Sequence, residues 1–361
     1  MNYYDWSEIS RSLLLKKLEK YGVRGKELKW FTSYFINRKQ SVKIGEYESE
    51  WTNVENGCSQ GSVLAPLLFI LYINDIVKVL NKVKIKLFAD DALLYIDCND
   101  LKDGMKIMNE DLENVYQWMC ANNLAVNVKK SNCMIVTRKK YDAADCIIKI
   151  GKEKLERVHF MKYLGVFIDE KLLMVDNLNY VKSKILKKLG LLRRLSEKLN
   201  AETKILLYKS VVSPHFDYCP SMLFMLSDSG IQELQRLQNK FMRNILKLKR
   251  DTPVKSMLDM LSFMSVKQRL GYNIIKMFYK IENDLLPDYL KKFMLKNKEK
   301  NEYNLRRKSL YDIPNFTKTF IQDSLFYKGL KLFNSFKLKN VNCLENKSFK
   351  STCIKYVKEN L

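Results

Sequence analysis

The spacing of hydrophobic and polar positions divides the chain into a mixed first part and a helical second part. Up to about Asp169, short apolar runs alternate with stretches of helical spacing. The apolar spacing from Ser12 to Tyr21 predicts a helix. The stretch from Ser41 to Val54 contains two strand-like pieces on either side of Gly45, which predicts a β-hairpin.

The next segments predict a helix followed by a pair of strands. The range from Ser62 to Leu80 is mostly helical in its apolar spacing. The range from Val83 to Asp97 contains two short apolar strands that meet at Asp90 and Asp91. This places two adjacent carboxylates at the tip of a predicted hairpin.

An amphipathic helix and further strands complete the first part. Asn99 or Asp100 caps this helix, which is predicted by five apolar residues at helical spacing: Met105, Met108, Leu112, Val115 and Met119. Strands return from Cys133 to Thr137 and from Met161 to Ile168. The predicted class is α+β, with helices crossing one face of a small antiparallel sheet.

After Asp176 the pattern becomes helical and strongly basic. The range from Val181 to Lys198 contains one acid, Glu197, and seven basic residues: Lys182, Lys184, Lys187, Lys188, Arg193, Arg194 and Lys198. A second helix from Ile231 to Arg250 has a basic stripe made of Arg236, Lys240, Arg243, Lys247 and Arg250. Its opposite stripe is apolar and consists of Leu234, Leu237, Phe241, Ile245 and Leu248. From Asn301 onward the pattern is basic and aromatic, with weaker helical spacing.

Charge and composition indicate an intracellular partner that is a polyanion. The 361 residues include 64 Lys and Arg against 40 Asp and Glu, a formal net charge of +24. Such a surface attracts nucleic acid first and an anionic membrane second. The longest apolar run, Val63 to Ile73, is too short to span a bilayer, and no secretory signal precedes Asp5. The eight cysteines contain no C-x-x-C pair, so we expect reduced thiols in the cytoplasm or nucleus and no secretion.

The candidate chemistry begins with Phe88-Ala89-Asp90-Asp91 between two apolar strands. Adjacent carboxylates repel each other and become favourable together when divalent cations lie between them and a phosphate. Phosphoryl transfer uses two such ions to hold the attacking and the leaving oxygen. An ordinary turn is the alternative, because Asp is common in β-turns.

A second candidate segment lies upstream, from Gly57 to Phe69. A glycine-bearing turn leads there into an apolar helix, and Gly61 permits close approach of the backbone to a ligand. The amide of Gln60 could contact a nucleotide or template. The alternative is a plain helix entry with Ser62 as N-cap.

Together these two segments resemble the reverse transcriptases of non-LTR retrotransposons of the Jockey type. The string from Gly57 to Phe69 is similar to their motif B, G-x-P-Q-G-S-x-L-x-P-x-L-F, with Ser59 in place of the usual proline. Phe88 to Asp91 matches their F-A-D-D motif C. The resemblance implies a polymerase palm, a small antiparallel sheet with helices on one face, followed by an all-helical thumb and a C-terminal helical region.

Three further stretches extend the resemblance through the first part. Leu13 to Gln40 resembles the segment that follows motif A, and Asn127 to Ser131 resembles the motif D loop. In that loop Lys130 matches the lysine thought to protonate the leaving pyrophosphate. Tyr163-Leu164-Gly165 resembles the primer grip, the turn that holds the growing 3′ end. The alternatives are a solvated loop lysine and a plain hairpin aromatic.

Later segments between Leu207 and Arg269 look like the thumb and the region after it. The resemblance implies a clamp on an RNA–DNA hybrid, with the backbone bound by Lys184, Lys187, Arg194, Arg236, Lys240, Arg243 and Lys247. For any one of these residues a merely solvated helix face remains the alternative. His159 and His215 are expected to pack or hydrogen-bond rather than act as ligands. The implied domains are a fingers remnant and palm at 1–169, a thumb at 170–228 and a basic helical region at 229–361.

The implied function is RNA-directed DNA synthesis by two-metal nucleotidyl transfer. Asp90 and Asp91 would hold two Mg²⁺ ions, while the incoming nucleotide and template would be contacted by Gln60, Gly61, Phe88 and Ala89. The partners would be an RNA template, a DNA primer or target, and deoxynucleoside triphosphates, with no membrane.

One departure concerns motif A, whose D-L-x-x-A-F-D string supplies a third metal-binding Asp in relatives. In the register set by Leu13 to Leu18, the two aspartates of that string fall on Met1 and Ser7, and Asp5 lies outside the register. We therefore expect an N-terminally truncated, inactive polymerase. The alternatives are a non-catalytic RNA-binding protein, a maturase-like intron-encoded protein, which the stretch from Gln238 to Arg269 argues against, and a membrane-surface protein.

Overall fold

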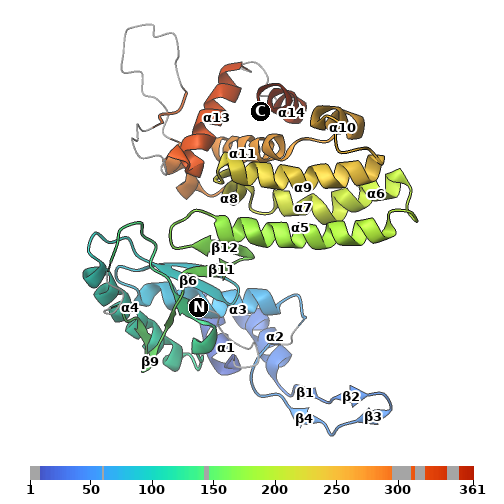
Figure 1. The fold of residues 1–361 in the computed structure, drawn as a ribbon. Coiled ribbons are helices and arrows are strands. Elements are labelled where there is room, and N and C mark those ends of the chain that lie inside the picture. The colour runs from blue at the N-terminus through green and yellow to red at the C-terminus, as the bar shows by residue number, and fades with distance from the viewer. Residues whose placement is uncertain (1–8, 59–60, 142–145, 295–309, 314–321, 340–348) are drawn as a thin grey trace. The chain divides into compact units, whose positions relative to one another are not determined.

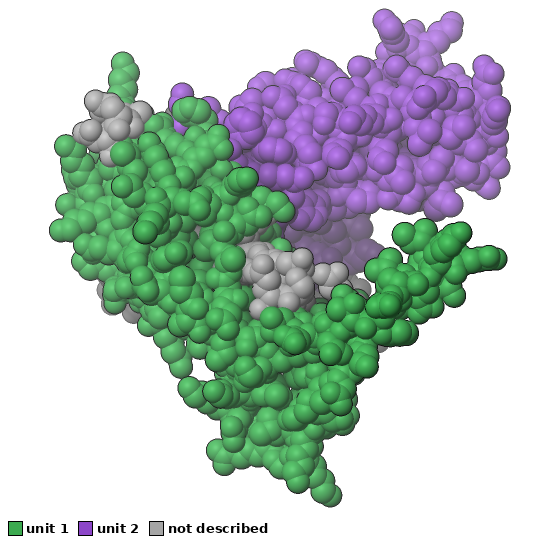
Figure 2. Space-filling view, turned by 90° about the horizontal axis from the view of Figure 1, so that it is seen from below, with its two compact units in different colours: residues 1–159 green, residues 160–361 purple. Residues whose placement is uncertain are grey.

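The computed structural model describes residues 9–58, 61–141, 146–294, 310–313, 322–339 and 349–361. The chain forms two compact units, Met1–His159 and Phe160–Leu361, which Figure 2 distinguishes by colour. Residues 160–169, which the sequence assigned together with the first domain, belong to the second unit. Each unit has its own hydrophobic core.

The helices of the first unit pack around two buried clusters, and α4 contributes residues to both. They are α1 (Arg11–Lys20), α2 (Gly25–Phe35), α3 (Ala65–Ile73), the 3-10 segments η2 (Asn74–Val79) and η3 (Val128–Lys130), and α4 (Leu101–Ala121). Leu14, Phe69 and Val115 are fully buried members of the larger cluster. The cap of α4 is Asp100, whose carboxylate accepts the amides of Lys102 and Asp103 at 2.8 and 3.1 Å. This confirms the second of the two predicted caps.

The strands of the first unit form separate pairs. They are β1 (Lys39–Gln40) with β4 (Thr52–Asn53), β2 (Lys43–Ile44) with β3 (Tyr47–Glu48), β5 (Lys84–Phe88) with β6 (Asp91–Tyr95), β7 (Asn132–Cys133) with β10 (Glu156–Arg157), and β8 (Lys149–Ile150) with β9 (Glu153–Lys154). All are antiparallel except β7 with β10, which is parallel.

The predicted single antiparallel sheet is therefore wrong for the described residues, although mixed helices and small antiparallel sheets are confirmed. The predicted strand from Cys133 to Thr137 is also too long, because only Cys133 of that range pairs. Its partner Arg157 lies far along the chain, and a local pattern carries no signal for such a pairing. The hairpin around Gly45 is confirmed, and in Figure 1 its ribbon extends beyond the helices of the unit.

A buried carboxylate fixes the start of the longest hairpin. Asp111 of α4 is 1% exposed and accepts the backbone amides of Asn81, Lys82 and Val83 at 2.8 to 3.1 Å. These hydrogen bonds outweigh the cost of burial and lower the pKa of Asp111. They anchor the backbone directly before β5, the strand that leads to Asp90.

The second unit begins with one hairpin and continues as helices. The hairpin is β11 (Phe160–Tyr163) with β12 (Val166–Asp169), and the helical segments are α5 (Val175–Leu195), α6 (Ala201–Leu207), the π-helical η4 (Tyr208–Val212), α7 (Pro214–Asp217), α8 (Pro220–Phe224), α9 (Asp228–Leu246), α10 (Val254–Leu261), α11 (Val266–Glu282), η5 (Asp288–Phe293), α13 (Leu325–Lys339) and α14 (Phe349–Asn360). Helices α5 and α9 lie side by side (Figure 1). None of the helices in the described ranges is long and apolar enough to cross a membrane.

Helix α9 has the predicted apolar face. Leu234, Phe241 and Ile245 are at most 2% exposed and join the core that α5 shares. The predicted basic stripe is shorter than expected, because the helix ends at Leu246. Lys247 follows it with a φ of 54° in the left-handed region, so it is the C-cap and not a member of the helix.

Candidate active site

The β5–β6 hairpin presents the two adjacent aspartates, as predicted. Phe88 pairs with Asp91, so the loop between the strands consists of Ala89 and Asp90 alone. Ala89 has a φ of 48°, a conformation that costs a residue with a Cβ roughly 1–2 kcal/mol. Phe88 is 61% exposed beside this loop. The tight loop therefore holds two carboxylates and an accessible aromatic ring together.

The electrostatics of this loop suit a bound cation. Burial, and next the neighbouring charge of Asp90, raise the pKa of Asp91. Neither carboxylate hydrogen-bonds or ion-pairs with another described residue. Two adjacent carboxylates that have no hydrogen-bonding or ion-pairing partner among the described residues are a donor set that hard divalent cations such as Mg²⁺ prefer. Nowhere in the described ranges, this loop included, do three His, Cys, Asp or Glu side chains gather closely enough to hold a metal ion, so the loop supplies two carboxylates only.

The glycine-bearing segment is held by a hydrogen bond at Gly57 and has free space around Gly61. The Gly57 amide donates to the carbonyl of Ile9 at 2.8 Å, and Cys58 is 6% exposed. Gly61 has a φ of 81°, and a Cβ there would meet no atom within 4 Å. The hydroxyl of Ser62 accepts the Ala65 amide at the start of α3. Gln60 lies outside the described residues.

An arginine that the sequence pattern did not single out holds this segment. Arg11 donates from Nε to the carbonyl of Gly57 at 2.9 Å. Its Nη1 donates to the carbonyls of Phe35, at 2.8 Å, and Val54. One guanidinium therefore connects the glycine segment to the end of α2 and to the residue that follows β4. The only sequence signal was a cation in the first turn of a helix, where the helix dipole favours an acid.

Lys130 lies at the end of the 3-10 turn η3. Its amide donates to the side chain of Asn127 at 3.3 Å, and its own side chain is exposed. The turn is continued by β7. The lysine is therefore accessible from solvent on a short, capped turn.

The segment Tyr163-Leu164-Gly165 forms the turn of the β11–β12 hairpin. Tyr163 pairs with Val166, and both loop residues have positive φ, 46° for Leu164 and 81° for Gly165. Positive φ at both loop positions is the signature of a type I′ turn, which matches the twist of the strands. Leucine is an unusual residue for the first position, because its Cβ makes this conformation strained.

Basic and aromatic residues gather beside this hairpin in the second unit. The ammonium groups of Lys162 and Lys184 lie 5.2 and 5.3 Å from the ring centre of Tyr180. Burial, and then the charges of Lys188 and Lys184, lower the pKa of His215. Lys162 lies on a strand of alternating exposure, outside the helical runs of charge that the sequence pattern singles out.

The other predicted backbone-binding residues differ in exposure. Lys187 and Arg194 on α5 and Arg236 and Lys240 on α9 are exposed. Arg243 is half-buried and donates to the carbonyl of Arg250 at 3.1 Å. Arg243 thus helps to close the loop after α9, which is a structural role beside any contact with a phosphate.

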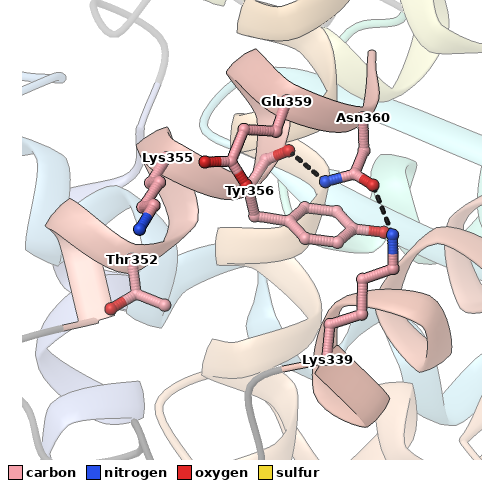
Figure 3. A pocket seen from close by; sticks show the side chains of 6 residues that line it. All are labelled: Lys339, Thr352, Lys355, Tyr356, Glu359 and Asn360. Carbon is pink, nitrogen blue, oxygen red and sulfur yellow. Dashed lines mark hydrogen bonds between the residues drawn. The ribbon is translucent and has the colours of Figure 1, made fainter.

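A pocket of about 410 Å³ lies elsewhere, between α13 and α14 (Figure 3). Lys339 reaches across it to the side chain of Asn360 at 2.5 Å. Its lining also includes Lys355, Tyr356 and Glu359. It contains none of the predicted site residues, so we do not assign it to the active site.

Comparison with known proteins agrees with the hairpin and the glycine segment. Residues 6–168 match the family model described as reverse transcriptase, RNA-dependent DNA polymerase. The chain is 29% identical over 221 residues to the probable RNA-directed DNA polymerase from transposon X-element of Drosophila melanogaster, covering 59% of this chain and 24% of that protein. It is 25% identical over 223 residues to the RNA-directed DNA polymerase from mobile element jockey of Drosophila funebris, again 59% and 24%.

A third relative is the Pol polyprotein from type-1 retrotransposable element R1 2 of Nasonia vitripennis, 27% identical over 175 residues, or 46% of this chain and 42% of that protein. The chain therefore spans between a quarter and two fifths of the length of these relatives. Residues 6–168 therefore form a reverse transcriptase domain, and the chain is similar to the RNA-directed DNA polymerases of non-LTR retrotransposons.

Proposed function

We propose that the chain binds an RNA template paired with a DNA primer and that Asp90 and Asp91 are the metal-binding carboxylates of its polymerase site. The observation that carries this proposal is the β5–β6 loop, where two carboxylates lie adjacent and burial, together with the charge of Asp90, raises the pKa of Asp91. The proposed arrangement is a palm that contains this loop, followed by a helical thumb and a C-terminal helical region.

The side chains around the loop have distinct proposed roles. Asp90 and Asp91 hold the two ions, which when bound neutralise charge on the reacting phosphate and align the primer hydroxyl. Gly61 lets the backbone approach the nucleotide, because the space a Cβ would fill is open. Gln60, Phe88 and Ala89 complete the nucleotide and template contacts.

Two proposed roles lie farther along the chain. Lys130 donates a proton to the leaving pyrophosphate, and its exposure on η3 is compatible with that role. The turn Tyr163-Leu164-Gly165 holds the primer end. The exposed cations of α5 and α9, together with Lys162, bind the phosphates of the hybrid without reading its sequence.

We further infer that this chain binds the hybrid but transfers nucleotides slowly. Met1 and Ser7 stand at the register positions where relatives carry the motif A aspartates. A two-metal site that lacks one carboxylate loses positioning and charge neutralisation, which are nearly all that a protein contributes to this chemistry.

Primer extension with Mg²⁺, a primed RNA template and all four deoxynucleotides tests both statements. We expect salt-sensitive binding of the hybrid and little extension. Clear extension that Asp90→Ala abolishes would confirm the polymerase site and contradict the expected slowness. Binding of RNA alone as tightly as the hybrid would favour a non-catalytic RNA-binding protein instead.

A further inference from the structure

The turn of the β11–β12 hairpin needs an external restraint. Leu164 adopts a left-handed φ of 46°, and a residue with a Cβ is rarely stable there by itself. Such strain persists only where surrounding groups fix the conformation. The hairpin pairs only four residues on each strand, so its ladder alone is a weak restraint.

Tyr218 supplies a direct restraint on this turn. Its hydroxyl donates a hydrogen bond to the carbonyl of Leu164, 54 residues earlier in the chain. Its ring lies over the second loop residue: a Cβ added to Gly165 would lie 3.2 Å from the Tyr218 hydroxyl and 3.3 Å from its Cε1. Both residues of the turn are therefore contacted by one side chain.

The position of Tyr218 does not follow from core packing. The residue is 58% exposed, whereas Phe216, two residues earlier, is fully buried. An exposed aromatic ring that folds back onto a turn leaves one face open to solvent and to a ligand of that turn. The hydrogen bond from Tyr218 can therefore have a role in ligand binding as well as in stability.

The backbone that carries Tyr218 is held by a charged cluster. The Tyr218 amide donates to the carbonyl of Pro214 at 2.9 Å at the end of α7. The neighbouring Asp217 accepts from Arg269 Nε at 2.6 Å, from a second nitrogen of the same guanidinium, and from Asn273 Nδ2 at 3.0 Å. Bidentate pairs of this kind fix orientation as well as distance. Helix α11 thereby sets the place of Tyr218.

We propose that Tyr218 is a positioning residue for the primer end, acting through the turn that it restrains, and that the Arg269–Asp217 pair on α11 and α7 holds it there. The proposal rests on the proposed role of the Tyr163-Leu164-Gly165 turn. It adds that the helices of the second unit, through Tyr218, help to position the 3′ end of the primer.

The test compares Tyr218→Phe with the wild type, because this change removes the hydroxyl and keeps the ring. Tyr47→Phe is the control, since Tyr47 on β3 is 86% exposed and its hydroxyl makes no hydrogen bond with another described residue. Hydrogen exchange of the amides of residues 161–168 reports on the turn. Fluorescence anisotropy reports the affinity for two RNA–DNA hybrids of equal length, one with a recessed DNA 3′ end and one with blunt ends.

For Tyr218→Phe we expect faster exchange in the hairpin by about 2- to 10-fold, the change that corresponds to one net hydrogen bond, with unchanged exchange in α9. Affinity for the recessed hybrid falls by a similar factor, and affinity for the blunt hybrid does not change. Tyr47→Phe matches the wild type in both measurements. A general loss of stability would instead alter exchange in α9 and weaken both hybrids.

Arg269→Gln provides a second, independent variant. It is expected to speed exchange in the same hairpin, and the double variant with Tyr218→Phe is expected to be less than additive, because both act on one turn. Full additivity would show that Arg269 does not act through Tyr218.

Two results overturn the proposal. The first is unchanged hairpin exchange in Tyr218→Phe, and the second is faster exchange with wild-type affinity for the recessed hybrid. If the wild type itself shows no preference for the recessed end, the proposed primer grip fails, and the exchange data decide separately whether Tyr218 restrains the turn.

Discussion

Two carboxylates of the first unit show how surroundings decide what an aspartate does. Asp111 is buried among three backbone amides, which lower its pKa. Asp91 has no hydrogen-bonding partner among the described residues, and burial together with Asp90 raises its pKa. The first arrangement stabilises the fold in the charged form, and the second stores repulsion that a cation can relieve.

Replacing Asp111 with asparagine should lower the free energy of unfolding by about 1–3 kcal/mol at pH 7, the cost of weakening charged hydrogen bonds to buried amides. Since the folded pKa is depressed, this contribution is present above the unfolded pKa of about 4 and disappears as the pH falls through the lower folded pKa. Urea unfolding of the variant and the wild type at several pH values measures this difference in the free energy of unfolding. A stability difference between variant and wild type that stays constant from pH 7 to pH 3 would contradict this account.

Replacing Asp91 with asparagine should have the opposite sign. Because the folded pKa is raised, the ionised carboxylate destabilises the folded state, and this penalty grows as the pH rises through the carboxylate range. At pH 7 without divalent cations, Asp91→Asn should therefore unfold at the same or a higher urea concentration than the wild type. A clear loss of stability would show that Asp91 has a structural partner.

Several helices and hairpins that form between residues close in sequence were predicted from local hydrophobic patterns. The apolar stripes of α4 and α9 and the hairpin that ends in Asp90 follow from periodicity over one or two turns. The parallel pairing of Cys133 with Arg157 could not be predicted, since two-residue strands carry almost no pattern. The guanidinium of Arg11 was also out of reach, because its acceptors are carbonyls 24 to 46 residues away.

Helix packing in the second unit makes a testable contrast between two glycines. A Cβ on Gly329 of α13 would lie 2.5 Å from the ring of Phe278 on α11, whereas a Cβ on Gly190 of α5 would meet nothing within 4 Å. Gly329→Ala should therefore destabilise the unit by about 1–3 kcal/mol through overpacking. Gly190→Ala should stabilise it by about 0.5–1 kcal/mol through helix propensity. Thermal unfolding of both variants measures these two effects. Equal changes of the melting temperature would contradict the packing of α11 on α13.

For the molecule as a whole, the formal charge of +24 sets the expected mode of nucleic-acid binding. Phosphate contacts release counterions, so affinity falls steeply with salt and depends little on sequence. We propose that the exposed cations on α5 and α9 and the Lys162–Tyr180–Lys184 group make such contacts in the second unit. The total charge alone does not distinguish these residues from surface lysines that are only solvated and bind no phosphate.

Lys187 on α5 is suited to a direct test because it is exposed and makes none of the cation–π contacts found for Lys184. Lys187→Gln should weaken hybrid binding at low salt and reduce the slope of log affinity against log salt by about 1, the value of one phosphate contact. Lys152→Gln, in the exposed β8–β9 turn, is the control and should leave the slope unchanged. Equal effects of both changes would mean that only net charge matters.

We have proposed that Asp90 and Asp91 form a metal site for an incoming nucleotide. The most direct measurement is the lifetime of the complex between the chain and a primed RNA template, with a chain-terminated primer, in the presence of Mg²⁺ and a deoxynucleotide. We expect the next complementary nucleotide to prolong this lifetime in the wild type, and a mismatched nucleotide to leave it unchanged. Asp90→Asn and Asp91→Asn should bind the template equally well and lose the effect. An effect that persists in both variants, or is absent from the wild type, would contradict the account.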